Sequence, residues 1–242
     1  MNEALITDIG STRETNQDTL AIETNLVGDK IYILCDGMGG YKGGEIASLE
    51  CSRFMAEDFK RSEFSSVDSI KEWLFNAIKN ANKKINEISK KNSELEKMGT
   101  TIVCLVVTKN YKVYASVGDS RIYSYNHKEI TQLSEDQTFA NALLKAGYIN
   151  EKEAEIHPKK GVLLSAIGSS DDELDIQINE IVDNNNYLLC SDGLYNMVEN
   201  KEIHKIINSS LDIEKRAQSL IDKANSNGGK DNVSVILVEG SL

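Results

Sequence analysis

The chain has 242 residues, of which 40% are hydrophobic, and this is enough to bury one sizeable core. Lysine and arginine number 27 and aspartate and glutamate number 38, so the formal net charge is −11. Such a chain repels phosphate backbones and anionic lipid surfaces, which argues against a nucleic-acid-binding or membrane-binding protein. Some of the acids can also be interpreted as ligands for cations.

The first third of the chain predicts three strands followed by two helices. The strands, at 4–10, 19–24 and 30–36, are rich in β-branched and apolar residues. Apolar residues then recur at helical spacing, first over 47–59 and again over 70–88. Both stripes are typical of helix faces that pack on a core.

Strands return in the middle of the chain, at 100–108, 112–118 and 120–126, and short polar turns join them. Links of this length cannot contain crossover helices, so we expect the three strands to be antiparallel neighbours. The stretch 138–156 then predicts helix, and it ends just before Pro158, the only proline of the chain.

The last third predicts strands near 174–180 and 187–191, two helices, and a closing strand at 232–239. The second of these helices carries an apolar stripe over 213–224. No linker rich in proline, glycine or serine divides the chain, and no repeat does. The sequence therefore predicts a single domain, residues 1–242, of the α+β class, with strand blocks and helix pairs segregated.

Neither a membrane span nor an export signal is indicated. The longest apolar run, IVCLVV at 102–107, is far shorter than the roughly 20 residues of a spanning helix. The N-terminal MNEALITD carries acids where a signal peptide needs basic and then apolar residues. We therefore expect a soluble cytoplasmic protein.

The cysteines and histidines do not form a recognisable site. The four cysteines, Cys35, Cys51, Cys104 and Cys190, lack CxxC spacing and lie among apolar residues. Burial as small hydrophobic residues is therefore favoured over a disulfide or zinc framework. The three histidines are scattered, which disfavours a histidine metal cluster or a histidine-based triad.

Five aspartates stand beside glycine or small polar residues where predicted strands begin or end. IYILCDG ends at Asp36 and Gly37, and NYLLCSDG ends at Asp192 and a further glycine. The others are Asp18 in RETNQDT, Asp119 in SVGDSR and Asp231 in NGGKDNVSV. One Asp-Gly pair is an ordinary turn signal, but five acids in such positions indicate a shared site.

If the sheets bring these strand ends together, the carboxylates repel one another unless cations lie between them. Hard divalent ions such as Mg²⁺ or Mn²⁺ take carboxylate, carbonyl and water oxygens. We therefore interpret Asp36 as a metal ligand, with bare glycine backbone leaving room for a carbonyl ligand and a large substrate. Two phosphate-binding motifs are absent, because GxGxxG would need glycine at Lys42 and no G-K-[ST] occurs.

In sequence the chain resembles the metal-dependent Ser/Thr protein phosphatases of type 2C, especially the stand-alone bacterial members. The matching segments run in order from about Thr7 to Glu239: TDIGSTRETNQD, CDGMGGYKGGEIAS, GTT, SVGDSRIY, LSEDQT, LLSAIG, CSDGLYN and GGKDNVSVI. Each segment alone is weak, but their order and spacing together are specific. The resemblance implies a four-layer αββα sandwich, in which two central antiparallel sheets are flanked by helices.

The resemblance also implies metal ligands. Asp36 matches the carboxylate that bridges two metal ions, and Gly37 matches the residue that offers its carbonyl. Asp192 and Asp231 match the remaining ligands of one ion, and Asp119 matches an acid that helps hold a third, looser ion. The expected cofactors are thus Mn²⁺ or Mg²⁺, as two core ions and a third.

Two further residues match positions that act on water and substrate. Asp18 matches an acid that acts mainly through metal-bound water, and Arg13 matches the arginine that grips the substrate phosphate. A water that bridges two dications loses a proton near neutral pH and can attack phosphorus. A guanidinium can donate two parallel hydrogen bonds to one phosphate, which the single ammonium group of lysine cannot do.

The chain departs from many relatives at two positions. Met38 follows the Asp-Gly pair where many eukaryotic relatives have a histidine, so water or another donor must protonate the leaving oxygen. Gln137 stands where relatives commonly carry histidine, which argues against a histidine role there. Residues 138–161 match the flap beside the site, the segment that varies most between members.

The expected function is hydrolysis of phosphoserine and phosphothreonine in proteins, opposing a bacterial Ser/Thr kinase, by a monomer. A phosphatase of phosphorylated sigma-factor regulators is an alternative within the family. A non-catalytic binding protein on the same fold is disfavoured, because the four metal-matching aspartates remain. A metal-dependent nuclease is disfavoured by the acidic charge.

Overall fold

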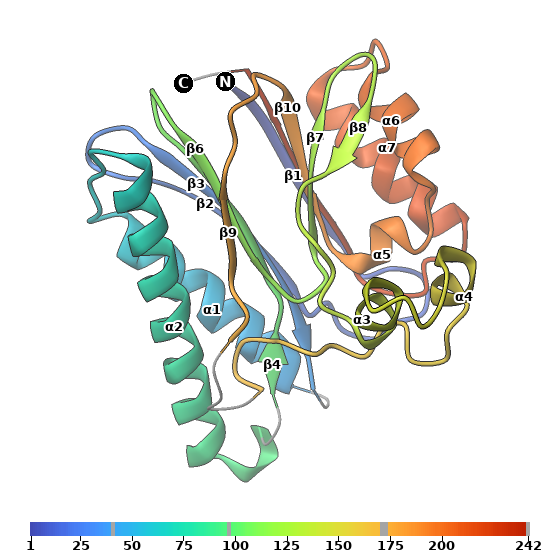
Figure 1. The fold of residues 1–242 in the computed structure, drawn as a ribbon, viewed down its shortest axis with the longest axis horizontal. Helices are drawn as coiled ribbons and strands as arrows, with labels where there is room; N and C mark the ends of the chain where they lie inside the picture. The colour runs from blue at the N-terminus through green and yellow to red at the C-terminus, as the bar shows by residue number, and fades with distance from the viewer. Residues whose placement is uncertain (40–41, 96–97, 170–173, 241–242) are drawn as a thin grey trace.

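Two antiparallel sheets lie face to face in the middle of the protein, and helices cover the outer face of each (Figure 1). The structure is a computed structural model that describes residues 1–39, 42–95, 98–169 and 174–240. This arrangement confirms the α+β class and the αββα layering that the sequence predicts.

Both sheets contain only antiparallel pairs. The first sheet has the order β1 (Asn2–Asp8), β11 (Val233–Glu239), β10 (Asn186–Cys190), β7 (Arg121–Tyr125) and β8 (Ile130–Gln132). The second has the order β2 (Asp18–Thr24), β3 (Lys30–Met38), β5 (Ile102–Val107), β6 (Lys112–Val117) and β9 (Gln177–Glu180). The short β4 (Gly99–Thr100) pairs with the end of β3.

Each sheet carries its own pair of covering helices (Figure 1). The second sheet packs against α1 (Gly43–Phe59) and α2 (Val67–Lys91), which the 3-10 turn η1 (Ser93–Leu95) follows. The first sheet packs against α6 (Asn200–Ile207) and α7 (Ile213–Ser226). The apolar stripes predicted at 47–59, 70–88 and 213–224 face these cores.

A third apolar layer joins the two sheets to each other. Tyr32 and Leu34 of β3 face Leu189 of β10 and Ile236 of β11, and all four side chains are fully buried. Because this layer fixes the two sheets face to face, the strand ends that carry the aspartates meet at one end of the sandwich.

The turn at Gly118 and Asp119 carries the chain from one sheet to the other. The expectation that 112–118 and 120–126 are antiparallel neighbours is therefore wrong, although 100–108 and 112–118 do pair. Gly118 has a φ of 99°, in the left-handed region, and its N–H and carbonyl both bond to Gln137. A three-residue link, here 118–120, can cross between packed sheets as readily as it can close a hairpin, and the sequence does not distinguish the two cases.

The helical stretch expected at 138–156 is two short helices, α3 (Phe139–Lys145) and α4 (Glu151–Glu155). Gly147, at a φ of 75°, ends the first, and the Asn150 side chain caps the second by accepting a bond from the Glu153 N–H. The strand expected near 174–180 is shorter than predicted, since β9 begins at Gln177, and β8 is an additional strand.

The four cysteines are buried and unpaired, as their apolar surroundings predict. Among the described helices, none has both the length and the apolar character that a membrane crossing requires.

The Gly118 turn yields a stability prediction. A side chain at this position would adopt a strained φ and would also meet the Thr101 side chain, whereas Gly28, at a φ of 95°, faces open space. We expect Gly118→Ala to lower the free energy of unfolding by about 2–4 kcal/mol. Gly28→Ala should cost only the backbone strain, about 1–2 kcal/mol. Denaturant unfolding of the two variants measures the difference, and equal costs would contradict the role given to Thr101 at this turn.

Candidate active site

Aspartates from five separate segments gather where the two sheets end. Asp36 of β3 lies directly opposite Asp18, the first residue of β2, in the antiparallel register. Asp192 begins the short helix α5 (Asp192–Tyr195), Asp119 lies in the turn between the sheets, and Asp231 precedes β11. The structure thus brings together all five acids that the sequence singled out.

Burial and the proximity of these acids to one another raise the pKa of Asp36 and Asp192. Desolvation is the largest cause that raises the pKa of Asp36 well above its usual range, and the other four carboxylates raise it further. Desolvation, followed by the charges of Asp119, Asp231 and Asp18, raises the pKa of Asp192 to about 8. Both side chains keep partial exposure to solvent. In the absence of cations, the cluster therefore holds protons that isolated aspartates would release.

The Asp18 carboxylate accepts a hydrogen bond at one oxygen and has no hydrogen-bond partner at the other. The Ser191 hydroxyl donates to Asp18 Oδ2 at 2.7 Å, whereas the buried Oδ1 has no hydrogen-bond partner. The pKa of Asp18 is raised to about 6, mainly because burial removes the carboxylate from water. An orphaned carboxylate oxygen among other carboxylates indicates a place for a water or a cation.

Close backbone approach explains the glycine that follows each of two acids. A Cβ at Gly37 would overlap the carbonyl oxygens of Gly44 and Gln17, and one at Gly193 would overlap that of Asn232. The room left by these glycines is therefore filled by the protein's own backbone. The expectation that bare glycine backbone leaves room for a large substrate therefore does not hold on the Cβ side of Gly37.

Asn232 is a site residue that the sequence analysis missed. Its Oδ1 accepts a bond from the Gln17 N–H at 2.8 Å, and its Nδ2 donates to the carbonyls of Ile9 and Thr15, both at 2.9 Å. This single amide ties the loop 9–17 to the residue after Asp231. The one feature of the sequence that points to Asn232 is its position directly after Asp231, a candidate metal ligand.

Arg13, on this loop, lies at the edge of the acidic cluster. Its Nη2 donates to Asp231 Oδ2 at 2.7 Å, and 54% of its side chain is exposed. The hydrogen bond to Asp231 is the largest cause that raises the pKa of the Arg13 guanidinium. The guanidinium thus occupies the position of a cation against a candidate metal ligand, and it is free to turn toward solvent.

The donor set fits hard divalent cations. Within the described ranges, no three histidine, cysteine, aspartate or glutamate side chains surround one common metal position, so waters or a carbonyl would have to complete any coordination. All candidate donors are oxygens, which suits Mg²⁺ and Mn²⁺. The unpartnered Asp18 oxygen and the mutual repulsion of the acids also point to a bound positive charge.

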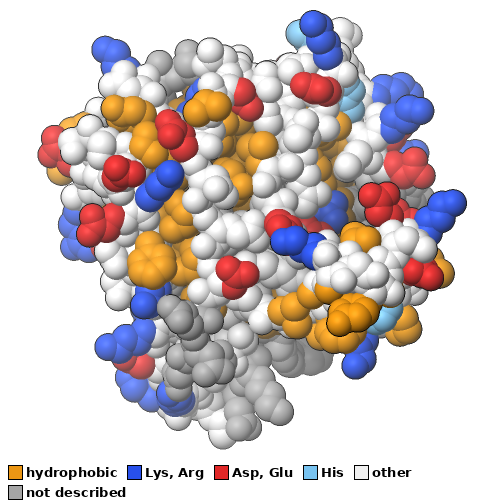
Figure 2. Space-filling model, viewed as in Figure 1, with side chains coloured by type: hydrophobic (Ala, Val, Ile, Leu, Met, Phe, Trp, Pro, Cys, Tyr) orange, Lys and Arg blue, Asp and Glu red, His pale blue; other side chains and the backbone are white. Residues whose placement is uncertain are grey.

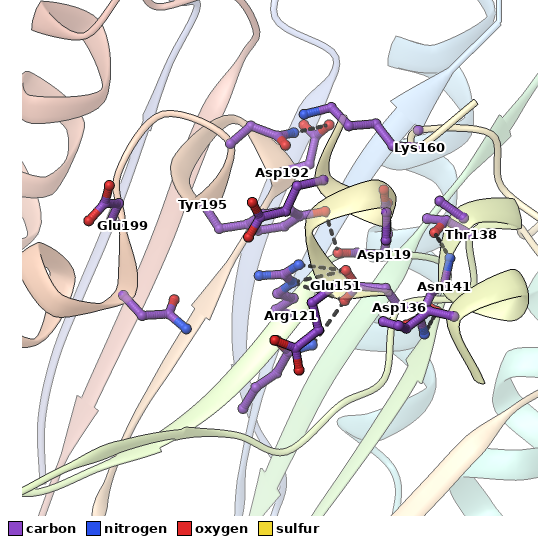
Figure 3. A pocket seen from close by; sticks show the side chains of 18 residues that line it. Asp119, Arg121, Asp136, Thr138, Asn141, Glu151, Lys160, Asp192, Tyr195 and Glu199 are labelled. Carbon is purple, nitrogen blue, oxygen red and sulfur yellow. Dashed lines mark hydrogen bonds and ion pairs between the residues drawn. The ribbon is translucent and has the colours of Figure 1, made fainter. Parts of the chain in front are cut away.

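A pocket of about 800 Å³ adjoins this cluster (Figure 3). Asp119 and Asp192 line one side, and α3 and α4 of segment 138–161 line the other. Arg121 bonds to Asp136 at 2.6 Å and stacks on the Tyr195 ring, 3.4 Å from its centre. The Tyr195 hydroxyl donates to the Asp119 carbonyl at 3.0 Å, so this stack also supports the turn that carries Asp119.

Gln137 braces the same turn from the base of segment 138–161. Its Oε1 accepts a bond from the Gly118 N–H at 2.7 Å, and its Nε2 donates to the Asp175 carbonyl at 2.6 Å. The side chain is buried, which fits a supporting role. Met38, the last residue of β3, likewise offers no acid or base.

Comparison with known proteins agrees with this geometry. A family model described as protein phosphatase 2C matches residues 11–228. A serine/threonine phosphatase stp of Listeria monocytogenes is 36% identical over 100% of this chain and 97% of its own length. Among solved structures, a Streptococcus agalactiae serine/threonine phosphatase has a TM-score of 0.92 at 34% identity, covering 99% of both chains.

A catalytic domain of the serine/threonine protein phosphatase PstP, solved in complex with two manganese ions, has a TM-score of 0.86 at 28% identity. It matches 100% of this chain and 98% of its own. The chain therefore belongs to the protein phosphatase 2C family. It is a serine/threonine protein phosphatase of type 2C, like these bacterial relatives.

The raised pKa of Asp192 predicts how the stability of the metal-free protein depends on pH. The folded protein binds this proton more tightly than the unfolded chain, so stability falls as the pH rises from 3.8 to about 8. Asp192→Asn cannot ionise and should lose less stability over this range. At pH 8.5 in chelator, we expect its melting temperature to exceed that of wild type by about 2–4 °C or more.

The difference in melting temperature between variant and wild type should shrink at pH 5.5, where Asp192 of the wild type is largely protonated. Thermal melts of both proteins at the two pH values test this. A variant that melts below wild type at pH 8.5 would show that repulsion at Asp192 does not limit stability.

Proposed function

We propose that this protein hydrolyses phosphoserine and phosphothreonine in other proteins with Mn²⁺ or Mg²⁺ held by the aspartate cluster. The observation that carries this is the convergence of aspartates from five segments at one end of the two sheets, beside a pocket. The Mn²⁺ complex of the related PstP catalytic domain supports the choice of cation.

The proposed ligands follow the acids of the cluster. Asp36, the Gly37 carbonyl, Asp192 and Asp231 would hold two core ions, and Asp119 would help hold a third more loosely. When bound, such ions lower the pKa of water and neutralise charge on a phosphoryl group. Asp18, fixed by Ser191, would accept a hydrogen bond from water and so orient it toward phosphorus.

Arg13 would bind the substrate phosphate. Its guanidinium is half-exposed at the edge of the cluster, and its one described ion pair is with Asp231. A positive charge in the cluster would compete for this carboxylate and release the guanidinium for a phosphate. The forked donor also offsets the repulsion between a phosphoprotein and a chain of net charge −11.

We further propose residues 1–242 as one catalytic domain in which the flap, residues 138–161, forms a wall of the substrate pocket. The flap lines the pocket opposite Asp119 and Asp192. Two apolar side chains of the flap, Tyr148 and Ile156, are exposed, and so are Val162 and Leu164 directly after it. Hydrophobic side chains gather over this part of the molecule (Figure 2). Exposed apolar groups beside a catalytic pocket suit contact with a polypeptide rather than with a small phosphoester.

The partners in this proposal are phosphoproteins and the Ser/Thr kinase that phosphorylates them. Phosphorylated sigma-factor regulators are one such substrate group. A monomer in the cytoplasm that binds neither nucleic acid nor membranes stays our prediction.

Hydrolysis assays test the proposed activity. With Mn²⁺, we expect turnover of a phosphothreonine peptide and neither a phosphotyrosine peptide nor a nucleic acid as substrate. Asp36→Asn should lower kcat/KM by at least about 100-fold, because it weakens the charge that holds the cations. Asp68→Asn, an exposed acid at the start of α2, is the matched control and should leave kcat/KM unchanged. Full activity of Asp36→Asn at saturating Mn²⁺ would refute the assignment.

Arg13 substitutions test the proposed phosphate contact. A forked, charge-assisted bond contributes roughly 1.5–3 kcal/mol, or about 10- to 150-fold in kcat/KM. Arg13→Ala should lose this factor and Arg13→Lys should recover part of it, since one ammonium cannot form the fork. Mn²⁺ binding should not weaken in Arg13→Ala, because Asp231 loses a competitor. Measurement of kcat/KM on the phosphothreonine peptide tests this contact. A kcat/KM of Arg13→Ala within about twofold of the wild-type value would exclude it.

A further inference from the structure

Thr101 lies between the segments that carry two of the acids. It occupies the break between β4 and β5 and is 2% exposed. Its Oγ1 accepts a bond from the Asp36 N–H at 3.1 Å, and its own N–H donates to the Asp36 carbonyl at 2.8 Å. Both backbone polar groups of Asp36 are therefore held by this one residue.

The same hydroxyl reaches the other sheet. Thr101 Oγ1 lies 2.7 Å from Ser120 Oγ, and Ser120 directly precedes β7. One hydroxyl can donate one bond and accept two, so it can bond to Asp36 and Ser120 at once. The Thr101 methyl group lies against Gly118, where an added Cβ would meet it. Thr101 thus contacts both neighbours of Asp119.

The backbone next to Thr101 is itself held in place by hydrogen bonds. Thr100, the preceding residue, exchanges two backbone bonds with Ile167, at 2.9 and 2.8 Å. Its hydroxyl donates to the Asp36 carbonyl at 2.9 Å. The next residue along that loop, Gly168, donates its N–H to the buried Asn82 side chain at 2.6 Å. The backbone at Thr101 is therefore anchored to α2 and cannot shift freely if its hydroxyl bonds are lost.

We infer that Thr101 is a positioning residue that sets the spacing between Asp36 and Asp119, and with it the affinity of the cation held through Asp119. This inference rests on the proposed function, since it assigns both acids to cations. Its physical basis is that a buried hydroxyl with partners in both sheets resists relative movement of the two strand ends. Loss of the hydroxyl leaves the Asp36 N–H and the Ser120 hydroxyl short of a partner.

Two substitutions separate the hydroxyl from the shape of the side chain. Thr101→Val keeps the volume and removes the hydroxyl, and Thr101→Ser keeps the hydroxyl and removes the methyl group. Thr108→Val is the matched control at the far end of the same strand. There the hydroxyl accepts bonds from the Asn110 and Tyr111 N–H groups, away from the acids.

Calorimetric titration with Mn²⁺ and kinetics on a phosphothreonine peptide are the two measurements. Supporting contacts behind metal ligands are typically worth about 10- to 100-fold in affinity or activity. We expect Thr101→Val to keep two tight Mn²⁺ per chain, to weaken the loosest Mn²⁺ by about 10-fold or more, and to lower kcat similarly. Substrate KM should change by less than about twofold, because Thr101 is buried and does not line the pocket. For Thr101→Ser, both the affinity for the loosest Mn²⁺ and kcat should stay within about threefold of the wild-type values.

The control separates positioning from folding. Thr108→Val should lower the melting temperature and leave Mn²⁺ binding and kcat unchanged. A wild-type protein that binds no Mn²⁺ would overturn the proposed function itself. If wild type binds Mn²⁺ and Thr101→Val loses only thermal stability, as Thr108→Val does, the inference about Thr101 is overturned and the proposed function stands.

Discussion

The mutual repulsion of the clustered carboxylates is the constraint around which this protein is built. Desolvation and neighbouring charge raise the pKa of Asp36 well above its usual range and that of Asp192 to about 8. Such a cluster opposes folding in the metal-free chain, so other parts of the molecule have to hold it. The apolar layer between the sheets does this, because its fully buried side chains fix the strands whose ends carry the acids.

Polar contacts at both ends of the sandwich add to this restraint. At the end away from the cluster, Glu3 of β1 accepts bonds from Lys30 Nζ at 2.8 Å and from the Tyr32 hydroxyl at 2.6 Å, both on β3. At the cluster itself, Thr101 and Ser120 join the sheets. The two sheets are thus joined by polar contacts at both ends of the sandwich.

The sequence was sufficient to predict the buried faces and to single out the acids, because both follow from local patterns, whereas the αββα layering was implied by the resemblance to the type 2C phosphatases. Apolar periodicity indicates which faces are buried, and aspartate beside glycine at strand ends marks Asp36 and Asp192. It was not sufficient for contacts that join distant segments. Nothing in the sequence near Asn232 shows that its amide binds the loop 9–17, and nothing near Gln137 shows that it braces Gly118. The crossing at Gly118 was misjudged for the same reason, since the choice of sheet depends on distant strands.

The pairing of β1 with β11 determines when the first sheet can form during synthesis of the chain. Arg13 and Asp231 are 218 positions apart in the chain, yet they form an ion pair, and β1 finds its hydrogen-bonding neighbour only in β11. Translation proceeds from the N-terminus, so the first strand leaves the ribosome long before its partner exists. The acidic cluster gains Asp231, and β1 gains its partner strand β11, only when residues 231–239 have been made. A chain that stops before Asp231 therefore lacks both the ion-pair partner of Arg13 and the strand that joins β1 to β10.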